Sequence, residues 1–109
     1  MRDRRRGGSG FRQISSVKLR YQKRALQQID KPLGYIAARS PQGAAKVEAR
    51  LMAMVALLQL QSFVGRKTTI PRVRRVFLTP YPYLIDYYVG DDEIVIQRFR
   101  HTARNPLPD

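Results

Sequence analysis

The chain has 109 residues, of which 43% are hydrophobic, so it can form a single domain with one modest core. Its 21 Lys and Arg residues outnumber its 8 Asp and Glu residues, and the formal net charge of +13 predicts an acidic partner such as nucleic acid, a ribosome, an anionic lipid surface or an acidic protein. The absence of cysteine excludes disulfides and thiolate zinc sites, and the single histidine, His101, excludes a histidine-rich metal site.

The first residues of the chain are strongly basic. Residues 1–13 hold five Arg, three Gly and little that a core would bury. This composition predicts a disordered basic arm over residues 1–14, which either contacts phosphates or reflects an upstream translation start. No apolar stretch follows the arginines, so the arm is not a signal peptide, and no run approaches the roughly 18 apolar residues of a membrane span. A cytoplasmic protein fits these features.

A short strand and a helix are expected next. Residues 16–21 alternate apolar and basic side chains, which is typical of a strand with one buried face. Apolar residues then recur at steps of three and four between Leu26 and Ile36, which predicts a helix. Pro32 removes one backbone hydrogen bond and Gly34 follows it, so we expect a kink or break there.

A second, longer helix is expected from Pro41 to about Phe63. Ser40 is a suitable N-cap, and proline at the first helical position loses no hydrogen bond. One stripe of apolar residues runs along this helix and consists of Val47, Leu51, Met54 and Leu58. Gly65 ends the segment, and a basic loop follows.

Three β-rich segments complete the domain. They cover residues 72–78, 81–89 and 93–100. Gly90, Asp91 and Asp92 form a turn signal, so the last two strands should be antiparallel. The order strand, helix, helix and three-stranded meander predicts an α+β fold in which the helix pair covers one face of the sheet and the first strand joins that sheet.

Several stretches carry a family resemblance. Residues 74–85 (RRVFLTPYPYLI) are similar to an Arg–apolar strand, a PYPY segment and an apolar strand in the RelE/ParE toxins of type II toxin–antitoxin modules. Residues 92–96 continue this likeness, and residues 98–106 (RFRHTARNP) resemble the ParE-type ending of His, two small residues and Arg. Residues 24–37, followed by an Ala-rich helix, also fit the family. The resemblance implies a toxin domain over residues 15–106 and a short tail over 107–109.

The family contains two target classes: RelE-like members cleave mRNA in the ribosomal A site, and ParE-like members poison DNA gyrase. Cleavage needs an activated 2′-hydroxyl, a stabilised phosphate and a protonated leaving oxygen. Where the nuclease branch has an arginine, this chain has Leu78, and its tail after His101 contains no tyrosine. The resemblance therefore favours gyrase inhibition without catalysis. A ribosome-dependent endoribonuclease is the alternative, and a non-toxic basic nucleic-acid-binding module is a further one.

Cationic side chains are the candidates for target binding. The set comprises Arg74, Arg98, Arg100, His101 and Arg104, with Tyr83 and Arg66 as secondary contacts. Inhibition by binding needs no general base, only a basic and shape-complementary surface. Strict alternation along the last strand places Arg98 and Arg100 on the same face as Ile94 and Ile96.

Most of these candidates also have a purely structural interpretation. Arg74 either contacts a phosphate or bridges a carboxylate such as Asp86. His101 is either a general base or a structural residue at a strand end. The acidic residues 91–93 lie in a turn and are read as solvated rather than metal-binding. The strand tyrosines can stack on bases or pack in the core, and packing is favoured for Tyr81, Tyr83, Tyr87 and Tyr88.

The resemblance also implies partners. An acidic antitoxin is expected to lie across the helices and the sheet and to pair its carboxylates with the basic surface. DNA gyrase is the expected target, and the ribosome with its mRNA is the alternative. No cofactor, metal, membrane or small-molecule substrate is expected.

Overall fold

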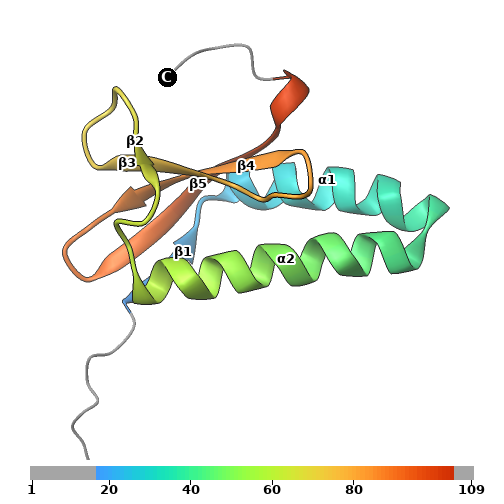
Figure 1. Ribbon diagram of the computed structural model, residues 1–109, viewed down its shortest axis with the longest axis horizontal. Helices are drawn as coiled ribbons and strands as arrows, with labels where there is room; N and C mark the ends of the chain where they lie inside the picture. Colours follow the sequence, from blue (N-terminus) through green and yellow to red (C-terminus); the bar gives the residue numbers. More distant parts are fainter. Residues whose placement is uncertain (1–16, 105–109) are drawn as a thin grey trace, which may run out of the picture.

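The structure, a computed structural model, describes residues 17–104. Two helices lie under a twisted sheet of five strands (Figure 1). In chain order the elements are β1 (Lys18–Tyr21), α1 (Lys23–Arg39), α2 (Pro41–Leu60), β2 (Arg66–Lys67), β3 (Val73–Phe77), β4 (Tyr83–Val89), β5 (Glu93–His101) and the 3-10 turn η2 (Thr102–Arg104). This order confirms the predicted α+β fold. The predicted basic arm and the tail over 107–109 lie outside the described residues.

The sheet has the strand order β1-β5-β4-β3-β2. β1 runs parallel to β5, and all other neighbouring strands are antiparallel. The predicted three-stranded meander and the joining of the first strand to the sheet are therefore confirmed. β2 was not predicted, since its two residues fall in the expected basic loop. The Thr68 N–H bonds the Val73 carbonyl at 3.2 Å and closes the turn that pairs β2 with β3.

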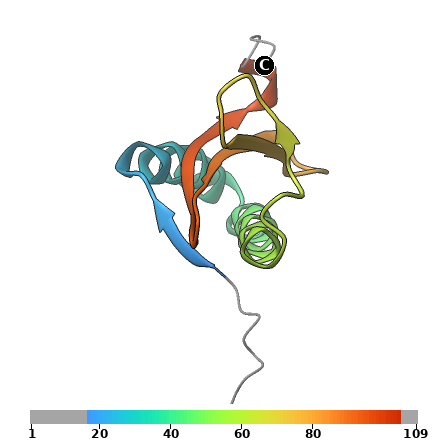
Figure 2. The same ribbon diagram turned by 90° about the vertical axis from the view of Figure 1, so that its left-hand side faces the viewer.

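Both helices lie against the same face of the sheet (Figure 2). The α1–α2 junction matches the prediction, because Ser40 caps α2 and Pro41 occupies the start of that helix. The Ser40 hydroxyl accepts a hydrogen bond from the Gly43 N–H at 2.9 Å. α2 ends at Leu60, three residues before the predicted end. Neither helix in residues 17–104 has the length and apolarity needed to cross a bilayer.

We expected a kink or break at Pro32, and α1 continues through this residue without a break. An interior proline costs a helix about 3 kcal/mol. Apolar residues on both sides of it pack against the core: Ile29 is buried before it, and Leu33 and Ile36 are partly buried after it. The tertiary packing of this apolar stripe outweighs the local penalty.

The core lies between the sheet and the two helices, and Tyr87 is its largest fully buried side chain. Its hydroxyl donates to the Ser62 carbonyl at 2.7 Å and accepts from the Gly65 N–H at 3.0 Å. A Cβ at Gly65 would lie 2.5 Å from that hydroxyl, so only glycine fits there. Tyr83 is buried in the same core, so both tyrosines pack inside the protein, as predicted. Tyr87 also fixes the chain segment that follows α2.

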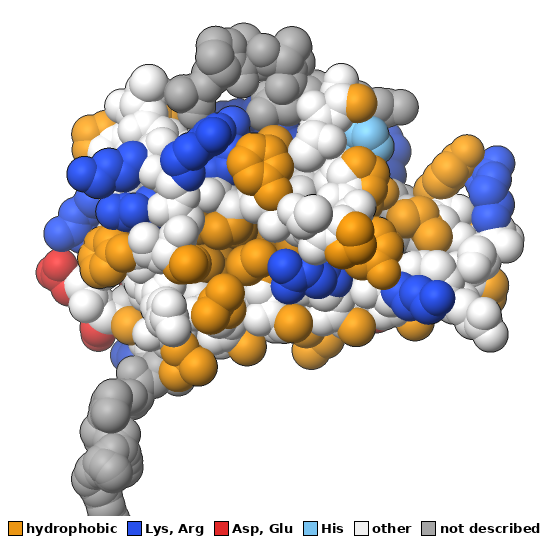
Figure 3. Space-filling model, viewed as in Figure 1, with side chains coloured by type: hydrophobic (Ala, Val, Ile, Leu, Met, Phe, Trp, Pro, Cys, Tyr) orange, Lys and Arg blue, Asp and Glu red, His pale blue; other side chains and the backbone are white. Residues whose placement is uncertain are grey.

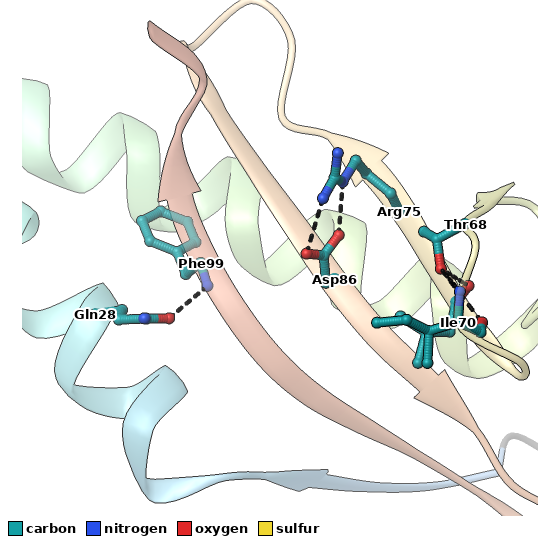
Figure 4. A network of polar contacts seen from close by, with 7 residues as sticks. Gln28, Thr68, Ile70, Arg75, Asp86 and Phe99 are labelled. Atoms are coloured by element: carbon teal, nitrogen blue, oxygen red, sulfur yellow. Dashed lines mark hydrogen bonds and ion pairs between the residues drawn. The ribbon is translucent and has the colours of Figure 1, made fainter. Parts of the chain in front are cut away.

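α1 also supplies a hydrogen-bond acceptor to the edge of β5. β1 pairs with residues 93–96 only, so the outer edge of β5 has no strand neighbour beyond that point. The Gln28 side chain takes the place of a strand there, since its Oε1 accepts from the Phe99 N–H at 2.9 Å (Figure 4). This contact fixes α1 beside the half of β5 that carries the predicted arginines.

Candidate target-binding surface

A β-bulge in β5 decides which way the predicted arginines point. Asp86 pairs with Arg98 and Tyr87 with Ile96, so Gln97 is an extra residue in β5. One inserted residue reverses the alternation of side chains beyond it. Arg98 and Arg100 therefore point away from the helices, and the prediction that they share a face with Ile94 and Ile96 is wrong. Phe99 joins the core instead.

We call the sheet face opposite the helices the open face. The strand registers place basic residues from four strands on it. They are Lys18 and Arg20 in β1, Arg66 in β2, Arg75 in β3, and Arg98 and Arg100 in β5. Its acidic residues within the described strands are Asp86 and Glu93. The excess of cations on a face that neither helix covers makes it the candidate surface for an acidic target.

One row of the open face crosses four strands in register. Arg66 lies opposite Arg75, Arg75 opposite Asp86, and Asp86 opposite Arg98. The Arg75 Nε donates to Asp86 Oδ1 at 2.7 Å and its Nη2 to Oδ2 at 3.1 Å (Figure 4). These two side chains are only 11% and 9% exposed. The row therefore holds three cations and a single carboxylate, and both oxygens of that carboxylate accept hydrogen bonds from Arg75.

Apolar side chains interleave with these cations. Phe77, Leu84 and Arg100 form the next row of the open face. The Arg66 guanidinium lies 5.6 Å from the centroid of the Phe77 ring, and Phe77 is 40% exposed. A cation over an aromatic face, next to further cations, can contact phosphates, carboxylates and flat apolar groups.

Arg74 lies on the other face, so the structure separates it from Arg98 and Arg100. Its Nη1 donates to the Gly65 carbonyl at 2.7 Å and to the Phe63 carbonyl at 3.2 Å. Its guanidinium also lies 5.0 Å from the Phe63 ring centroid. The carboxylate of Asp86, the partner considered for Arg74, binds Arg75 instead. Arg74 therefore ties β3 to the segment after α2.

His101 and Tyr83 also lie on the helix side of the sheet. Tyr83 stacks on Phe99 with ring centroids 5.0 Å apart, and His101 meets the Tyr83 ring edge-on at 5.4 Å. The His101 Nδ1 accepts a hydrogen bond from the Ala103 N–H at 3.1 Å. His101 thus holds the turn η2, which ends at Arg104. The predicted site residues therefore divide between the two faces, with Arg66, Arg98 and Arg100 together on the open one.

The acidic turn residues take part in ion pairs with arginines. Asp91 lies 3.3 Å from Arg72, and Glu93 lies 3.2 Å from Arg20. Among residues 17–104, no three His, Cys, Asp or Glu side chains come close enough together to hold a metal. Asp91 and Glu93 therefore each lie beside an arginine at this end of the sheet.

Comparison with known proteins places the chain among toxins. The model of the ParE toxin family of type II toxin–antitoxin systems (parDE) matches residues 19–106. The protein Y4kP of Sinorhizobium fredii is 33% identical over 79 residues, which make up 72% of this chain and 82% of Y4kP.

Solved structures share the fold. The chromosomal ParDE system of P. aeruginosa aligns with a TM-score of 0.67 at 24% identity, over 79% of this chain and 96% of that chain. The E. coli DinJ–YafQ toxin–antitoxin complex aligns with a TM-score of 0.58 at 13% identity, over 84% and 99% of the two chains. The isolated E. coli RelE toxin aligns with a TM-score of 0.55 at 14% identity, over 84% and 89%.

Proposed function

Because the chain belongs to the ParE toxin family and is therefore the toxin of a type II toxin–antitoxin system, we propose that it inhibits DNA gyrase by binding, and that an acidic antitoxin neutralises it. The toxin traps gyrase on cleaved DNA and so blocks replication. The open face carries this proposal, since it gathers Lys18, Arg20, Arg66, Arg75, Arg98 and Arg100 on a surface without helices.

The electrostatics of the open face suit a binding partner of opposite charge. Complementary charge raises the association rate and selects the orientation of the partners. Asp86 compensates only part of the cationic charge, because its single carboxylate forms a buried ion pair with Arg75. Arg98 flanks the same carboxylate from β5, so the centre of the face keeps a net positive charge.

Several features favour binding over RNA cleavage. Cleavage needs groups that can take up and release protons near neutral pH. The carboxylates of Asp86 and Glu93 on the open face both form ion pairs with arginines. His101 lies on the opposite side of the sheet, where its Nδ1 holds the Ala103 N–H. Leu78, at the position of the arginine in the nuclease branch, is fully buried.

A paired assay of the purified toxin tests the proposal. One arm measures DNA supercoiling and the amount of cleaved DNA trapped by gyrase, and the other maps mRNA cuts on translating ribosomes. We expect inhibition and trapped cleavage complexes in the first arm and intact mRNA in the second. Codon-positioned mRNA cuts with unaffected gyrase would instead establish a ribosome-dependent endoribonuclease. Activity in neither arm would refute both assignments.

A further inference from the structure

A pocket of about 460 Å³ opens at the end of the sheet, between the segment that leads into β3 and the β4–β5 turn. Phe63 and Ile70 supply apolar walls, and Lys67, Arg72 and Arg74 supply cations. We propose that this pocket, which we call the end pocket, receives a large apolar side chain from an acidic segment of the antitoxin. The inference rests on the proposed toxin–antitoxin function and assigns a place on the molecule to the antitoxin.

Large apolar side chains are exposed around the end pocket. Phe63 is 68% and Ile70 is 58% exposed, and both line the pocket. Leu60 and Val64, from the end of α2 and the segment after it, are 70% and 50% exposed. Apolar side chains gather along α2 and at its C-terminal end, with Lys and Arg side chains above them (Figure 3). Exposed apolar groups that cluster in this way mark a site of protein–protein contact.

The charges at the end pocket select an acidic occupant. Lys67, Arg72 and Arg74 line it, against one acidic residue, Asp91. Asp91 pairs with Arg72, whereas Arg74 bonds neutral carbonyl groups that leave its charge uncompensated. A second copy of this chain, itself at +13, would bring like charges together at this site. Exposed apolar walls suit an apolar anchor residue better than a phosphate backbone.

The segment that forms the pocket is held in place before any partner binds. The Thr68 hydroxyl donates to the Val73 carbonyl at 2.9 Å and accepts from the Ile70 N–H at 3.1 Å (Figure 4). Arg72 has a positive φ of 67°, which is uncommon for a residue with a long side chain. Strained backbone of this kind is concentrated at functional sites. A preformed pocket costs little ordering on binding, and this favours affinity.

Cations of the end pocket and cations of the open face point to opposite sides of the sheet. Lys67 and Arg74 are paired neighbours in β2 and β3 that point to the helix side, whereas Arg66 and Arg75 point to the open face. A substitution in the pocket should therefore weaken binding of the antitoxin and leave gyrase inhibition unchanged. Such a variant would be a toxin that escapes neutralisation.

The test uses the toxin and, as the probe, the acidic antitoxin that we expect a neighbouring gene to encode. Calorimetry measures the dissociation constant for the wild type, Ile70→Asp, Lys67→Glu and a control, Leu26→Asp. Leu26 is 45% exposed on α1 and does not line the pocket. We expect each pocket variant to weaken binding by about tenfold or more, as loss of an anchor does, and the control to change it by less than about twofold. Gyrase inhibition by all four proteins should be equal.

The outcomes separate the two proposals. If the wild type does not bind the neighbouring protein, the proposed antitoxin partnership fails. If the wild type binds and both pocket variants bind equally well, only the assignment of the end pocket fails. Weaker self-association of Ile70→Asp in sedimentation, with unchanged antitoxin affinity, would assign the pocket to a second copy and overturn the proposal. Lys67→Glu keeps the test valid if thermal unfolding shows that Ile70→Asp is misfolded.

Discussion

Arg75 and Asp86 face each other across β3 and β4 in the open face, and both guanidinium–carboxylate hydrogen bonds are formed, at 2.7 and 3.1 Å. Arg98 lies on the other side of the same carboxylate, in β5. Asp86 is therefore the one acidic residue between two arginines, and it is almost completely buried. The negative charge of Asp86 offsets the repulsion between Arg75 and Arg98, which lie on either side of it.

Removal of this carboxylate should destabilise the fold. Asp86→Ala removes the carboxylate that pairs with the buried Arg75 guanidinium, and loss of one member of a buried ion pair costs about 3–5 kcal/mol of unfolding free energy. Urea denaturation measures the change. The double variant Arg75→Met with Asp86→Leu should recover most of the stability, since it buries no unpaired charge. The control Asp92→Ala removes the same charge from an exposed turn and should change stability by less than about 0.5 kcal/mol. Equal midpoints for Asp86→Ala and wild type would refute a structural role for the pair.

A methyl group at Gly65 should disturb the segment after α2. The added Cβ would lie 2.5 Å from the Tyr87 hydroxyl and 3.0 Å from the Arg75 carbonyl. Overpacking of this kind destabilises by about 1–3 kcal/mol. Gly34→Ala is the matched control, because a Cβ there meets nothing within 4 Å inside α1. It should stabilise the helix by about 0.5–1 kcal/mol. Thermal unfolding should show a lower midpoint temperature than the wild type for Gly65→Ala and a higher one for Gly34→Ala. A raised midpoint for Gly65→Ala would contradict the close packing of Gly65 against Tyr87.

Features that depend on adjacent residues could be predicted from the sequence, whereas features that depend on distant contacts could not. The cap at Ser40 depends on adjacent residues and was predicted correctly, whereas the continuity of α1 through Pro32 depends on distant packing. The Arg75–Asp86 pair was missed, although counting outward from the PYPY turn between β3 and β4 pairs these two residues. The same count from the β4–β5 turn pairs Asp86 with Gln97, and the structure pairs it with Arg98. A bulge has no sequence signal of its own here, so alternation placed the β5 arginines on the wrong face.

The buried phenol of Tyr87 should make stability depend on alkaline pH. Burial raises the pKa of Tyr87 above its ordinary value of 10.0, while the hydrogen bond from Gly65 and the nearby Arg74 oppose this rise. The folded protein therefore holds this proton more tightly than the unfolded chain. The contribution to stability is complete below about pH 10 and is lost as the pH rises through the folded-state pKa.

Urea midpoints for the wild type and Tyr87→Phe, measured from neutral pH to above about pH 10, check this dependence. Tyr87→Phe should be less stable at neutral pH by about 1–3 kcal/mol, because the Gly65 N–H and the Ser62 carbonyl lose their partner. Its stability should fall less at alkaline pH than that of the wild type. Some decline should remain, since burial also raises the pKa of Tyr21. Identical alkaline slopes would show that Tyr87 does not titrate in this range.

The arginines of the open face should be required for toxicity but not for folding. Arg98→Gln with Arg100→Gln removes two cations from the proposed gyrase-binding surface. The control pair, Arg24→Gln with Lys46→Gln, removes two exposed cations from the helices, so both proteins have the same net charge. We expect the open-face pair to raise the concentration needed for half-inhibition of gyrase by about tenfold or more, because lost charge complementarity slows association and weakens docking. The control pair should stay close to the wild type, and thermal unfolding should show that both proteins are folded. The difference should shrink at high salt, where surface charges are screened. An equal loss of gyrase inhibition in both double variants would mean that net charge alone attracts the target and that the open face has no special part in binding.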